Sequence, residues 1–355
     1  MRQFGHAQHP FTRIKSTPHP DPMTSRQTLS IIVPVLNEAA NLGELADRLR
    51  AALAPVDVAW DVIAVDDGST DGTLAALRAL NASDPRFKAV ALSRNFGKER
   101  AIAAGLAYAA GDAAVLIDAD LQHPPEVIAE FVAEWRKGFD VVYGQRVDRD
   151  TDGPIRRRLT KLYYLLFAGL SRTSLPPGAG DFRLLSRRAV DAMNQLGERE
   201  RFNKGLYSWI GFPSVGVPYR VAERKSGGAK WSPRRLFHFA LDGIFSFSTV
   251  PLRISSIIGL LISLGCVAYG LWFLIYTLMF GADRPGFPSL IISIMFLSGI
   301  QLVSLGVVGE YLGRVYEEVK ARPLFLIAEE VGLAAPAETV RPELPRPRAI
   351  SGRLN

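Results

Sequence analysis

The fold is decided by the segment Val62-Ile63-Ala64-Val65-Asp66-Asp67-Gly68-Ser69-Thr70-Asp71-Gly72-Thr73. Its apolar run ends in two carboxylates and a glycine turn, and an amphipathic pattern at helical spacing begins at Thr73. A strand that passes so directly into a helix is typical of a parallel sheet covered by helices. The segment by itself also fits a plain turn in which Thr70 or Asp71 caps the following helix.

The same alternation of strand and helix extends on both sides of this segment. The predicted strands are Leu29–Val35, Val62–Asp66, Lys88–Leu92, Ala113–Asp118 and Asp140–Gly144. The predicted helices are Glu38–Ala54, Thr73–Asn81, Lys98–Ala110 and Pro124–Lys137. This order predicts a Rossmann-type α/β domain with a mostly parallel sheet. Ligands of such a sheet bind beyond the carboxyl ends of its strands.

Two long apolar stretches follow the α/β pattern, at Ile254–Phe280 and Pro288–Leu312. Each exceeds the ~20 residues that cross a bilayer, and the short connector Gly281–Phe287 predicts a transmembrane hairpin. A buried helical pair in a soluble core is the alternative, and it is disfavoured because such long, unpatterned helices are rare there. By the positive-inside rule both ends are cytoplasmic, because basic residues flank the hairpin at Arg224, Lys225, Lys230, Arg234, Arg235, Arg253, Arg314, Lys320 and Arg322.

The chain is predicted to divide into five segments. They are a disordered leader at 1–27, a cytoplasmic catalytic domain at 28–232, juxtamembrane amphipathic helices at 233–253, two transmembrane helices at 254–312 and a cytoplasmic tail at 313–355. The leader lacks the apolar core of a secretory signal, and Met23 offers an alternative start. Arg156–Leu170 has the pattern of a basic amphipathic helix, which fits either a membrane surface or an ordinary solvated face. The Pro- and Arg-rich chain beyond Arg322 is predicted to be largely disordered.

Composition narrows the functional classes. The net charge of +7 suits an anionic partner, such as nucleic acid, phospholipid headgroups or a phosphorylated substrate. Nucleic acid is disfavoured because the basic residues gather beside the apolar stretches and at an expected phosphate site. The single cysteine, Cys266, leaves no disulfide framework, zinc pair or redox motif. A dinucleotide oxidoreductase is disfavoured too, since no G-x-G-x-x-G follows the first strand.

A second acidic motif, Asp118-Ala119-Asp120-Leu121-Gln122, follows a predicted strand. Alternate residues of an extended segment face the same way, so Asp118, Asp120 and Gln122 can hold one hard divalent cation. Such a cation would neutralise a diphosphate leaving group. An isolated D-x-D is often only a solvated loop or a helix cap. The matching strand-end position of Asp66 favours the metal interpretation.

The two acidic motifs together resemble those of family 2 glycosyltransferases. The resemblance is to the polyprenyl-phosphate branch, which contains dolichol-phosphate mannose synthase and bactoprenol glucosyltransferases. It extends from Ser30 to about Val319 and rests on Ile32–Glu38, Asp66–Thr73, Ser93–Lys98, Asp118–Glu126, Gly180–Leu184 and Arg224–Trp231. It implies a GT-A-like catalytic domain on the cytoplasmic side of the inner membrane. Relatives with a paired span often form tetramers, so a homo-oligomer is expected.

The resemblance also implies a role for individual residues. The nucleotide-diphosphate sugar is expected against Pro34, Asn37, Glu38, Asp66, Asp67, Lys98, Asp118 and Asp120. Mg²⁺ or Mn²⁺ is expected at Asp118, Asp120 and Gln122, and the acceptor phosphate at Arg146, Arg157 and Lys230. Residues expected to act in catalysis are Asp120, Arg146, Arg183 and Arg224. His123 stands where several bacterial glucosyltransferases carry Asp and mannose synthases often carry His, so that position does not decide the donor sugar.

The acceptor chemistry predicts the mechanism. A phosphate monoester is anionic near neutral pH, so its oxygen can attack the anomeric carbon without a strong protein base. In-line displacement would invert that carbon, with UDP-glucose as the favoured donor and undecaprenyl phosphate as the acceptor. GDP-mannose or a UDP-linked modified sugar of the aminoarabinose type is the alternative donor. A processive synthase is disfavoured because the chain has no Q-x-x-R-W string, and a catalytically silent nucleotide-sugar-binding scaffold because the metal acids are present.

Overall fold

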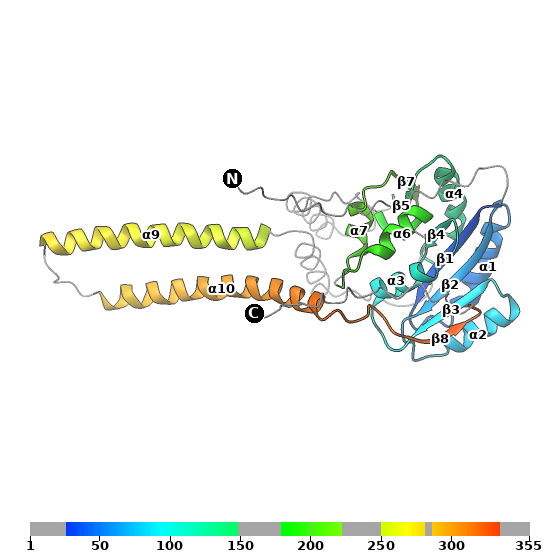
Figure 1. The fold of residues 1–355 in the computed structure, drawn as a ribbon, viewed down its shortest axis with the longest axis horizontal. Helices are drawn as coiled ribbons and strands as arrows, with labels where there is room; N and C mark the ends of the chain where they lie inside the picture. The colour runs from blue at the N-terminus through cyan, green and yellow to red at the C-terminus, as the bar shows by residue number, and fades with distance from the viewer. Residues whose placement is uncertain (1–25, 148–178, 200, 222–249, 281–285, 334–355) are drawn as a thin grey trace, which may run out of the picture.

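The structure is a computed structural model that describes residues 26–147, 179–199, 201–221, 250–280 and 286–333. These residues form an α/β domain and two long helices that extend from it side by side (Figure 1). The expected mostly parallel α/β sheet followed by two apolar helices is confirmed. The predicted basic helix Arg156–Leu170 and most of the leader and of the juxtamembrane segment lie outside the described residues.

The α/β domain is built on one mixed sheet of eight strands. The strands are β1 (Thr28–Val35), β2 (Ala59–Asp66), β3 (Phe87–Leu92), β4 (Ala113–Leu116), β5 (Val141–Arg146), β6 (Ala179–Ser186), β7 (Ser214–Tyr219) and β8 (Ile327–Val331). They lie in the order β7-β5-β6-β4-β1-β2-β3-β8. β6 and β8 run antiparallel to their neighbours, while β1 to β5 and β7 share one direction. The sequence pattern predicted β1 to β5 and missed the other three strands.

Helices cover both faces of this sheet. They are α1 (Leu42–Leu53), α2 (Thr73–Ser83), α3 (Lys98–Tyr108), α4 (Ile128–Arg136), α6 (Arg187–Gln195) and α7 (Asn203–Trp209), with the short 3₁₀ turn η1 (Pro125–Val127). Alternation along β1 sends Ile31 and Val33 into one core, with α1, α2 and α4, and Ile32 into the other, with α3, α6 and α7. Burying each such side chain contributes about 1.5–3 kcal/mol, which explains why the strands of this sheet are apolar on both faces.

Two observed boundaries differ from the predicted ones because polar loops occupy the residues that follow the strands β1 and β4. The helix predicted from Glu38 begins at Leu42, since Asn37 adopts a left-handed backbone with φ 55° and turns the chain. The strand predicted to end at Asp118 ends at Leu116, and Leu121 in the loop that follows has φ 60°. A left-handed backbone is unusual for residues other than glycine. Both turns lie at the carboxyl edge of the sheet.

The expectation of disorder beyond Arg322 is wrong for residues 327–331. These residues form β8, which pairs antiparallel with the edge strand β3. Glu329 accepts two hydrogen bonds from the Arg78 guanidinium, at 2.8 and 2.5 Å, and Tyr108 donates to Glu330. A strand of five residues with two glutamates has too little pattern to be found from sequence. It forms because it satisfies the open backbone groups of β3.

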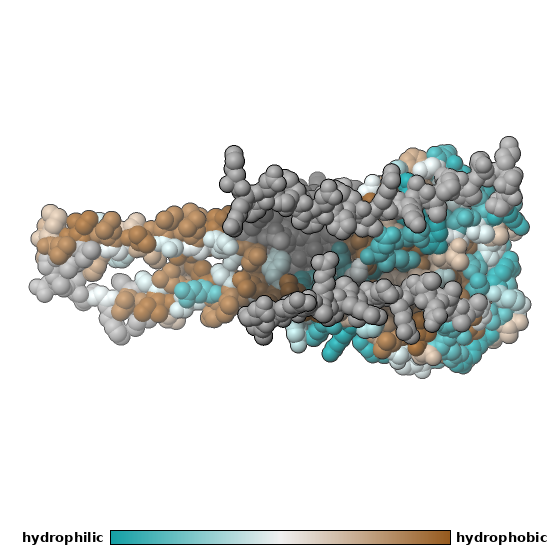
Figure 2. Space-filling model, in the orientation of Figure 1, coloured by the Kyte–Doolittle hydropathy of each residue, from teal (hydrophilic) through white to brown (hydrophobic). Residues whose placement is uncertain are grey.

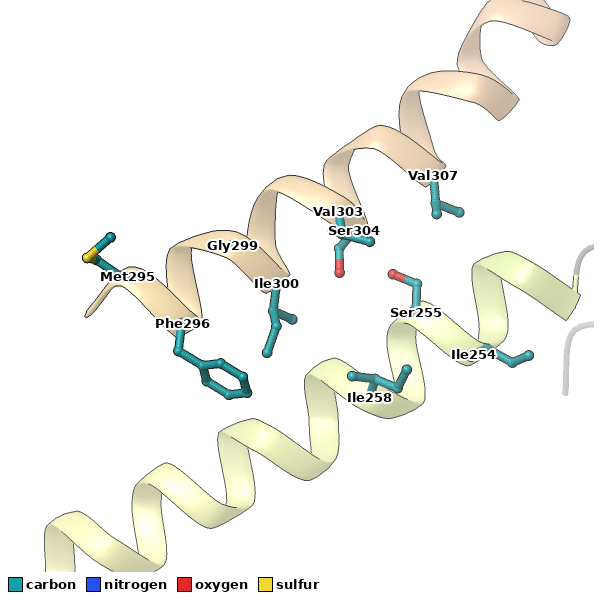
Figure 3. Close-up of a pocket in the computed structure, with 10 residues that line it drawn as sticks. All are labelled: Ile254, Ser255, Ile258, Met295, Phe296, Gly299, Ile300, Val303, Ser304 and Val307. Atoms are coloured by element: carbon teal, nitrogen blue, oxygen red, sulfur yellow. The ribbon is translucent and has the colours of Figure 1, made fainter. Parts of the chain in front are cut away.

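The two long helices are α9 (Val250–Phe280) and α10 (Phe287–Val319). Their segments Ile254–Phe280 and Ser293–Val319 are long and apolar enough to cross a membrane. Apolar residues extend along both helices, whereas hydrophilic ones gather on the α/β domain (Figure 2). Between the helices lies a mostly apolar pocket of about 540 Å³, across which Ser255 and Ser304 face one another (Figure 3). Exposed apolar side chains on this scale require lipid or protein as a neighbour.

Replacing Gly68 by alanine should destabilise the α/β domain. Gly68 has φ +73°, and an added Cβ would lie 2.6 Å from the backbone of both Arg94 and Asn95. A left-handed alanine costs on the order of 1–3 kcal/mol before this clash is counted. We expect a melting temperature several degrees lower in thermal unfolding of the full-length protein. The matched control is Gly43→Ala, at an exposed helical site with no atom within 4 Å, which should not lower it.

Candidate functional site

The parallel strands bring most predicted site residues to one edge of the sheet. Asn37 follows β1, Asp66 ends β2, Asp118 follows β4 and Arg146 ends β5, and these four strands share one direction. Because β6 is antiparallel, its beginning, with Asp181, lies at the same edge. Residues from five separate parts of the sequence therefore meet at one edge of the sheet.

Asn37 ties the end of β1 to the loop after β2. Its backbone N–H donates to Ser69 Oγ at 2.9 Å, and its Oδ1 accepts from the Thr70 N–H at 2.9 Å. The neighbouring Glu38 N–H donates to Thr73 Oγ1 at 3.0 Å. The first acidic motif is thus fixed by backbone N–H groups and one side chain of the loop that follows β1, which gives the edge a preformed surface.

The two carboxylates of the first motif have different roles. Asp66 is 3% exposed and accepts from the Ser69 N–H at 3.0 Å, so it shapes its own loop. Asp67 accepts from the Phe96 and Gly97 N–H groups at 2.7 and 2.9 Å, one with each oxygen. Burial raises the pKa of Asp67, and these two hydrogen bonds partly offset that effect. Asp67 therefore joins two loops, and the nucleotide contacts expected of Asp66 and Asp67 stay predictions.

A lysine bridges two carboxylates at the centre of the edge. Lys98 Nζ lies 2.6 Å from Asp118 Oδ1, 2.8 Å from Asp118 Oδ2 and 3.0 Å from Asp181 Oδ2. Burial would raise the pKa of Asp181, but the positive charges of Lys98, Lys204 and Arg183 lower it well below its ordinary value. Asp181 is an ionised part of this site that the sequence did not single out, although it lies in the segment Gly180–Leu184 used for the family resemblance.

His123 packs against the second acidic motif. Its ring stacks on Phe182 at 5.2 Å between centroids and meets the Tyr219 ring edge-on at 5.8 Å. Burial lowers the pKa of His123, although Asp118 Oδ2 lies 3.7 Å from its Nδ1. His123 is therefore a neutral packing residue in this structure. It supports the loop in which the Gln122 N–H donates to Asp120 Oδ1 at 3.2 Å.

The chemistry of Asp118 and Asp120 fits a magnesium or manganese ion shared with a substrate. Among the described residues, no group of three or more His, Cys, Asp and Glu side chains is arranged to hold a metal. Mg²⁺ does not need such a group, because it commonly takes one or two carboxylates and completes its shell with phosphate oxygens and water. Asp118 is 24% exposed at the edge, so a cation bound there could also contact a diphosphate. The side-chain oxygen of Gln122 would add a ligand of the same hard type.

Comparison with known proteins identifies the family. Residues 30–193 match the family described as Glycosyl transferase family 2. An uncharacterized glycosyltransferase of Synechocystis is 47% identical over 305 residues, which cover 86% of this chain and 96% of that protein. The chain belongs to glycosyl transferase family 2. The family resemblance inferred from the motifs is thereby confirmed.

The relatives of this glycosyltransferase include proteins with named substrates. The SfII prophage-derived bactoprenol glucosyl transferase of Shigella flexneri is 43% identical over 301 residues, 84% of this chain and 97% of that protein. A mannosyltransferase of Pyrobaculum calidifontis, solved with GDP-Man and Mn²⁺, aligns at 19% identity over 82% of this chain and 92% of that chain with a TM-score of 0.40. That structural likeness is too weak to carry an argument about this site.

Arg183, which we expected to act in catalysis, lies in a buried position. Arg183 is 3% exposed, its guanidinium lies 3.7 Å from the centroid of the Tyr207 ring, and it donates to the Gly180 carbonyl. In this family 2 glycosyltransferase Arg183 supports the start of β6, and its role in catalysis stays a prediction. Nothing in the sequence singled out Tyr207, since α7 shows no pattern that links it to the acidic motifs.

Glu99 is half-buried beside the start of α7. Its Oε2 accepts from the Asn203 N–H at 3.0 Å. Burial, and then repulsion from Asp181, raises the pKa of Glu99 to about 7. Nothing in the sequence pattern distinguished Glu99 from an exposed helical glutamate, because only the docking of α7 on α3 buries it.

Part of the predicted acceptor site is not described. Arg157, Arg224 and Lys230 lie outside the described residues. Arg146 ends β5 beside Tyr219 of β7, at the same edge as the acidic motifs. Its role toward the acceptor phosphate remains a prediction.

Replacing Glu99 by glutamine should stabilise the protein more at pH 8 than at pH 5. The folded pKa of about 7 exceeds the ordinary value of 4.5, so folding retains a proton that the unfolded chain releases between these values. The stability contribution of Glu99 therefore falls as pH rises through that window. We expect Glu99→Gln to add up to ~3 kcal/mol at pH 8 and little near pH 5, measured by thermal unfolding at both pH values.

The exposed Glu130 on α4 provides the matched control. In Glu130→Gln, the difference in stability between pH 5 and pH 8 should be the same as in the wild type. An equal effect of Glu99→Gln at pH 5 and pH 8 would contradict the burial argument.

Proposed function

We propose that this glycosyltransferase transfers one glucose from UDP-glucose to a polyprenyl phosphate such as undecaprenyl phosphate, with inversion at the anomeric carbon. The observation that carries the proposal is the presence, in one chain, of an acidic strand-edge site and two exposed apolar helices long enough to span a bilayer. Such a chain suits a water-soluble donor and a lipid acceptor. The relatives named bactoprenol glucosyl transferases, which match over nearly their whole length, support the choice of glucose and acceptor.

We assign separate groups of residues to the nucleoside, to the metal ion and to the acceptor phosphate. We assign Pro34, Asn37, Glu38 and Asp66 to the nucleoside side of the donor, next to the loop that Asn37 holds in place. A Mg²⁺ or Mn²⁺ ion bound by Asp118, Asp120 and Gln122 would neutralise charge on the departing diphosphate. Arg146, with Arg157, Arg224 and Lys230, is proposed to orient the acceptor phosphate. The phosphate oxygen is already anionic, so no protein base is needed for its attack.

We also propose that α9 and α10 form a membrane hairpin with both ends in the cytoplasm. The basic residues Arg253, Arg314 and Lys320 stand at the ends of these helices, as the positive-inside rule requires for a cytoplasmic flank. This places the catalytic domain beside the cytoplasmic pool of nucleotide sugars. A homo-oligomer, specifically a tetramer, is expected from the resemblance to relatives with a paired span.

The test of function is an assay of the purified full-length protein in detergent. It contains undecaprenyl phosphate, Mg²⁺ or Mn²⁺, and either UDP-glucose, GDP-mannose or a UDP-linked aminoarabinose. We expect UDP-glucose to give equal amounts of UDP and a β-linked glucosyl lipid. A lipid product from another donor alone would refute the glucose assignment. Binding of nucleotide sugars with no product from any of them would indicate a catalytically silent scaffold.

In the same assay, replacing Asp120 by asparagine should lower kcat at least ~100-fold, because a neutral amide is a poor ligand for the cation that stabilises the leaving group. The melting temperature should remain close to that of the wild type. The matched control is Asp47→Asn, at a side chain that is 78% exposed on α1, which should leave kcat roughly unchanged. Near-normal turnover of Asp120→Asn would refute the metal assignment.

The hairpin can be tested with a membrane-impermeant thiol reagent on intact cells. Cys266 is the single native cysteine, so Cys266→Ser supplies a background for introduced thiols. Asp283→Cys, between the two helices, should react from outside the cell. Asp57→Cys, at a side chain that is 87% exposed in the catalytic domain, should react only after lysis. Reaction of both positions from the same side would contradict the hairpin.

A further inference from the structure

We infer that Lys98 is a built-in counter-ion that competes with a divalent cation for Asp118, so that the cation binds tightly only together with the diphosphate of the donor. Asp181 is the positioning residue that holds the Lys98 ammonium when Asp118 binds the cation. This inference rests on the metal site of the proposed function and adds an order of binding to it.

The geometry of Lys98 is that of a cation already held by the acidic edge. Its ammonium contacts both oxygens of Asp118, at 2.6 and 2.8 Å, and one oxygen of Asp181, at 3.0 Å. Lys98 begins α3, immediately after Gly97, whose N–H is bound by Asp67. The position of the ammonium is therefore fixed at the backbone as well as at its tip. A flexible surface lysine would not have both restraints.

Competition follows from the distances. A divalent ion lies ~2.0–2.2 Å from a carboxylate oxygen that binds it. The ammonium within 2.8 Å of both Asp118 oxygens takes up the directions from which such an ion would approach. Two like charges so close together repel strongly at a partly buried site. A divalent ion bound to Asp118 must therefore displace the ammonium.

Asp181 gives the displaced ammonium a place to stay. The side chain of Asp181 is 14% exposed, and the positive charges of Arg183 and Lys204 act on it together with that of Lys98. Lys98 can keep the contact with Asp181 while it leaves Asp118, since the two contacts involve separate carboxylates. Its charge then remains at the edge, where the donor diphosphate would bind.

The donor diphosphate changes the balance of charge. A divalent ion alone adds positive charge beside the Lys98 ammonium. When the ion binds together with a nucleotide diphosphate, the negative charge of the diphosphate offsets the charges of the ion and of Lys98. The ion and the nucleotide should thus favour each other's binding, and the coupling must be reciprocal. A practical consequence is that the acidic edge discriminates against free divalent ions.

The test measures the binding of Mn²⁺ alone to the purified full-length protein, by the electron paramagnetic resonance signal of free Mn²⁺, without acceptor or sugar transfer. Lys98→Met should bind Mn²⁺ at least ~10-fold more tightly than the wild type, which corresponds to ~1.4 kcal/mol. Lys98→Arg, which keeps the charge, should bind it as weakly as the wild type. Adding UDP should tighten Mn²⁺ binding by a larger factor in the wild type than in Lys98→Met.

Two further variants complete the test. Lys98→Gln should behave as Lys98→Met does and provides a polar substitute if the methionine variant unfolds. Asp181→Asn should weaken Mn²⁺ binding, because the ammonium is then left to Asp118 alone. The inference is overturned if neutral variants of Lys98 bind Mn²⁺ no more tightly than the wild type, or if Lys98→Arg tightens binding equally. Unchanged or tighter binding in Asp181→Asn would refute the retaining role of Asp181.

These outcomes are separate from those of the transfer assay. If UDP-glucose is not the donor, the comparison of Mn²⁺ binding without nucleotide still tests the inference. If the protein transfers glucose but Lys98 variants bind Mn²⁺ as the wild type does, the proposed function survives and this inference fails.

Discussion

The arrangement of this protein depends on balancing negative charge at one edge of a sheet. Parallel strands bring their carboxyl ends together, and here that places Asp66, Asp118 and Asp120 at one edge, which the start of antiparallel β6 extends with Asp181. Carboxylates that converge in this way are stable only if cations or hydrogen-bond donors reach them. Backbone N–H groups donate hydrogen bonds to Asp66 and Asp67, and the Lys98 ammonium forms ion pairs with Asp118 and Asp181.

The same balance would suit the site to the two phosphorylated substrates that we propose. An acidic edge by itself would repel a nucleotide diphosphate and a lipid phosphate. The ammonium of Lys98 within the edge, and Arg146 at the end of β5, add the opposite charge at the positions where phosphates are proposed to bind. Arg183, which we expected to act in catalysis, is buried and contacts Gly180, at the start of β6, and the Tyr207 ring.

The long helices are linked to the catalytic sheet by more than chain connectivity. Only residues 320–326 separate α10 from β8, and β8 completes the sheet beside β3. Near the end of α10, Glu318 accepts from the Arg199 N–H at 2.6 Å. The strand β3 leads through a loop that ends at Gly97 to Lys98, the first residue of α3, so the helix pair is anchored close to the site. This anchoring would suit the membrane acceptor that we propose.

The sequence by itself determined the strands β1 to β5, the helices α1 to α4 and the two apolar helices, because each rests on local periodicity or on the length of an apolar run. It also located Asp118 and Asp120, since polar residues directly after buried strands must lie at the carboxyl edge. Only the tertiary structure showed that Asp67 joins two loops, that Arg183 is buried, that Glu99 is half-buried beside α7, and that Asp181 shares Lys98 with Asp118. These roles arise from contacts between segments far apart in the chain, and so does the short strand β8, whose own pattern is weak. Local patterns report the preferences of a segment, whereas burial, charge pairing and edge pairing are set by the segments it meets.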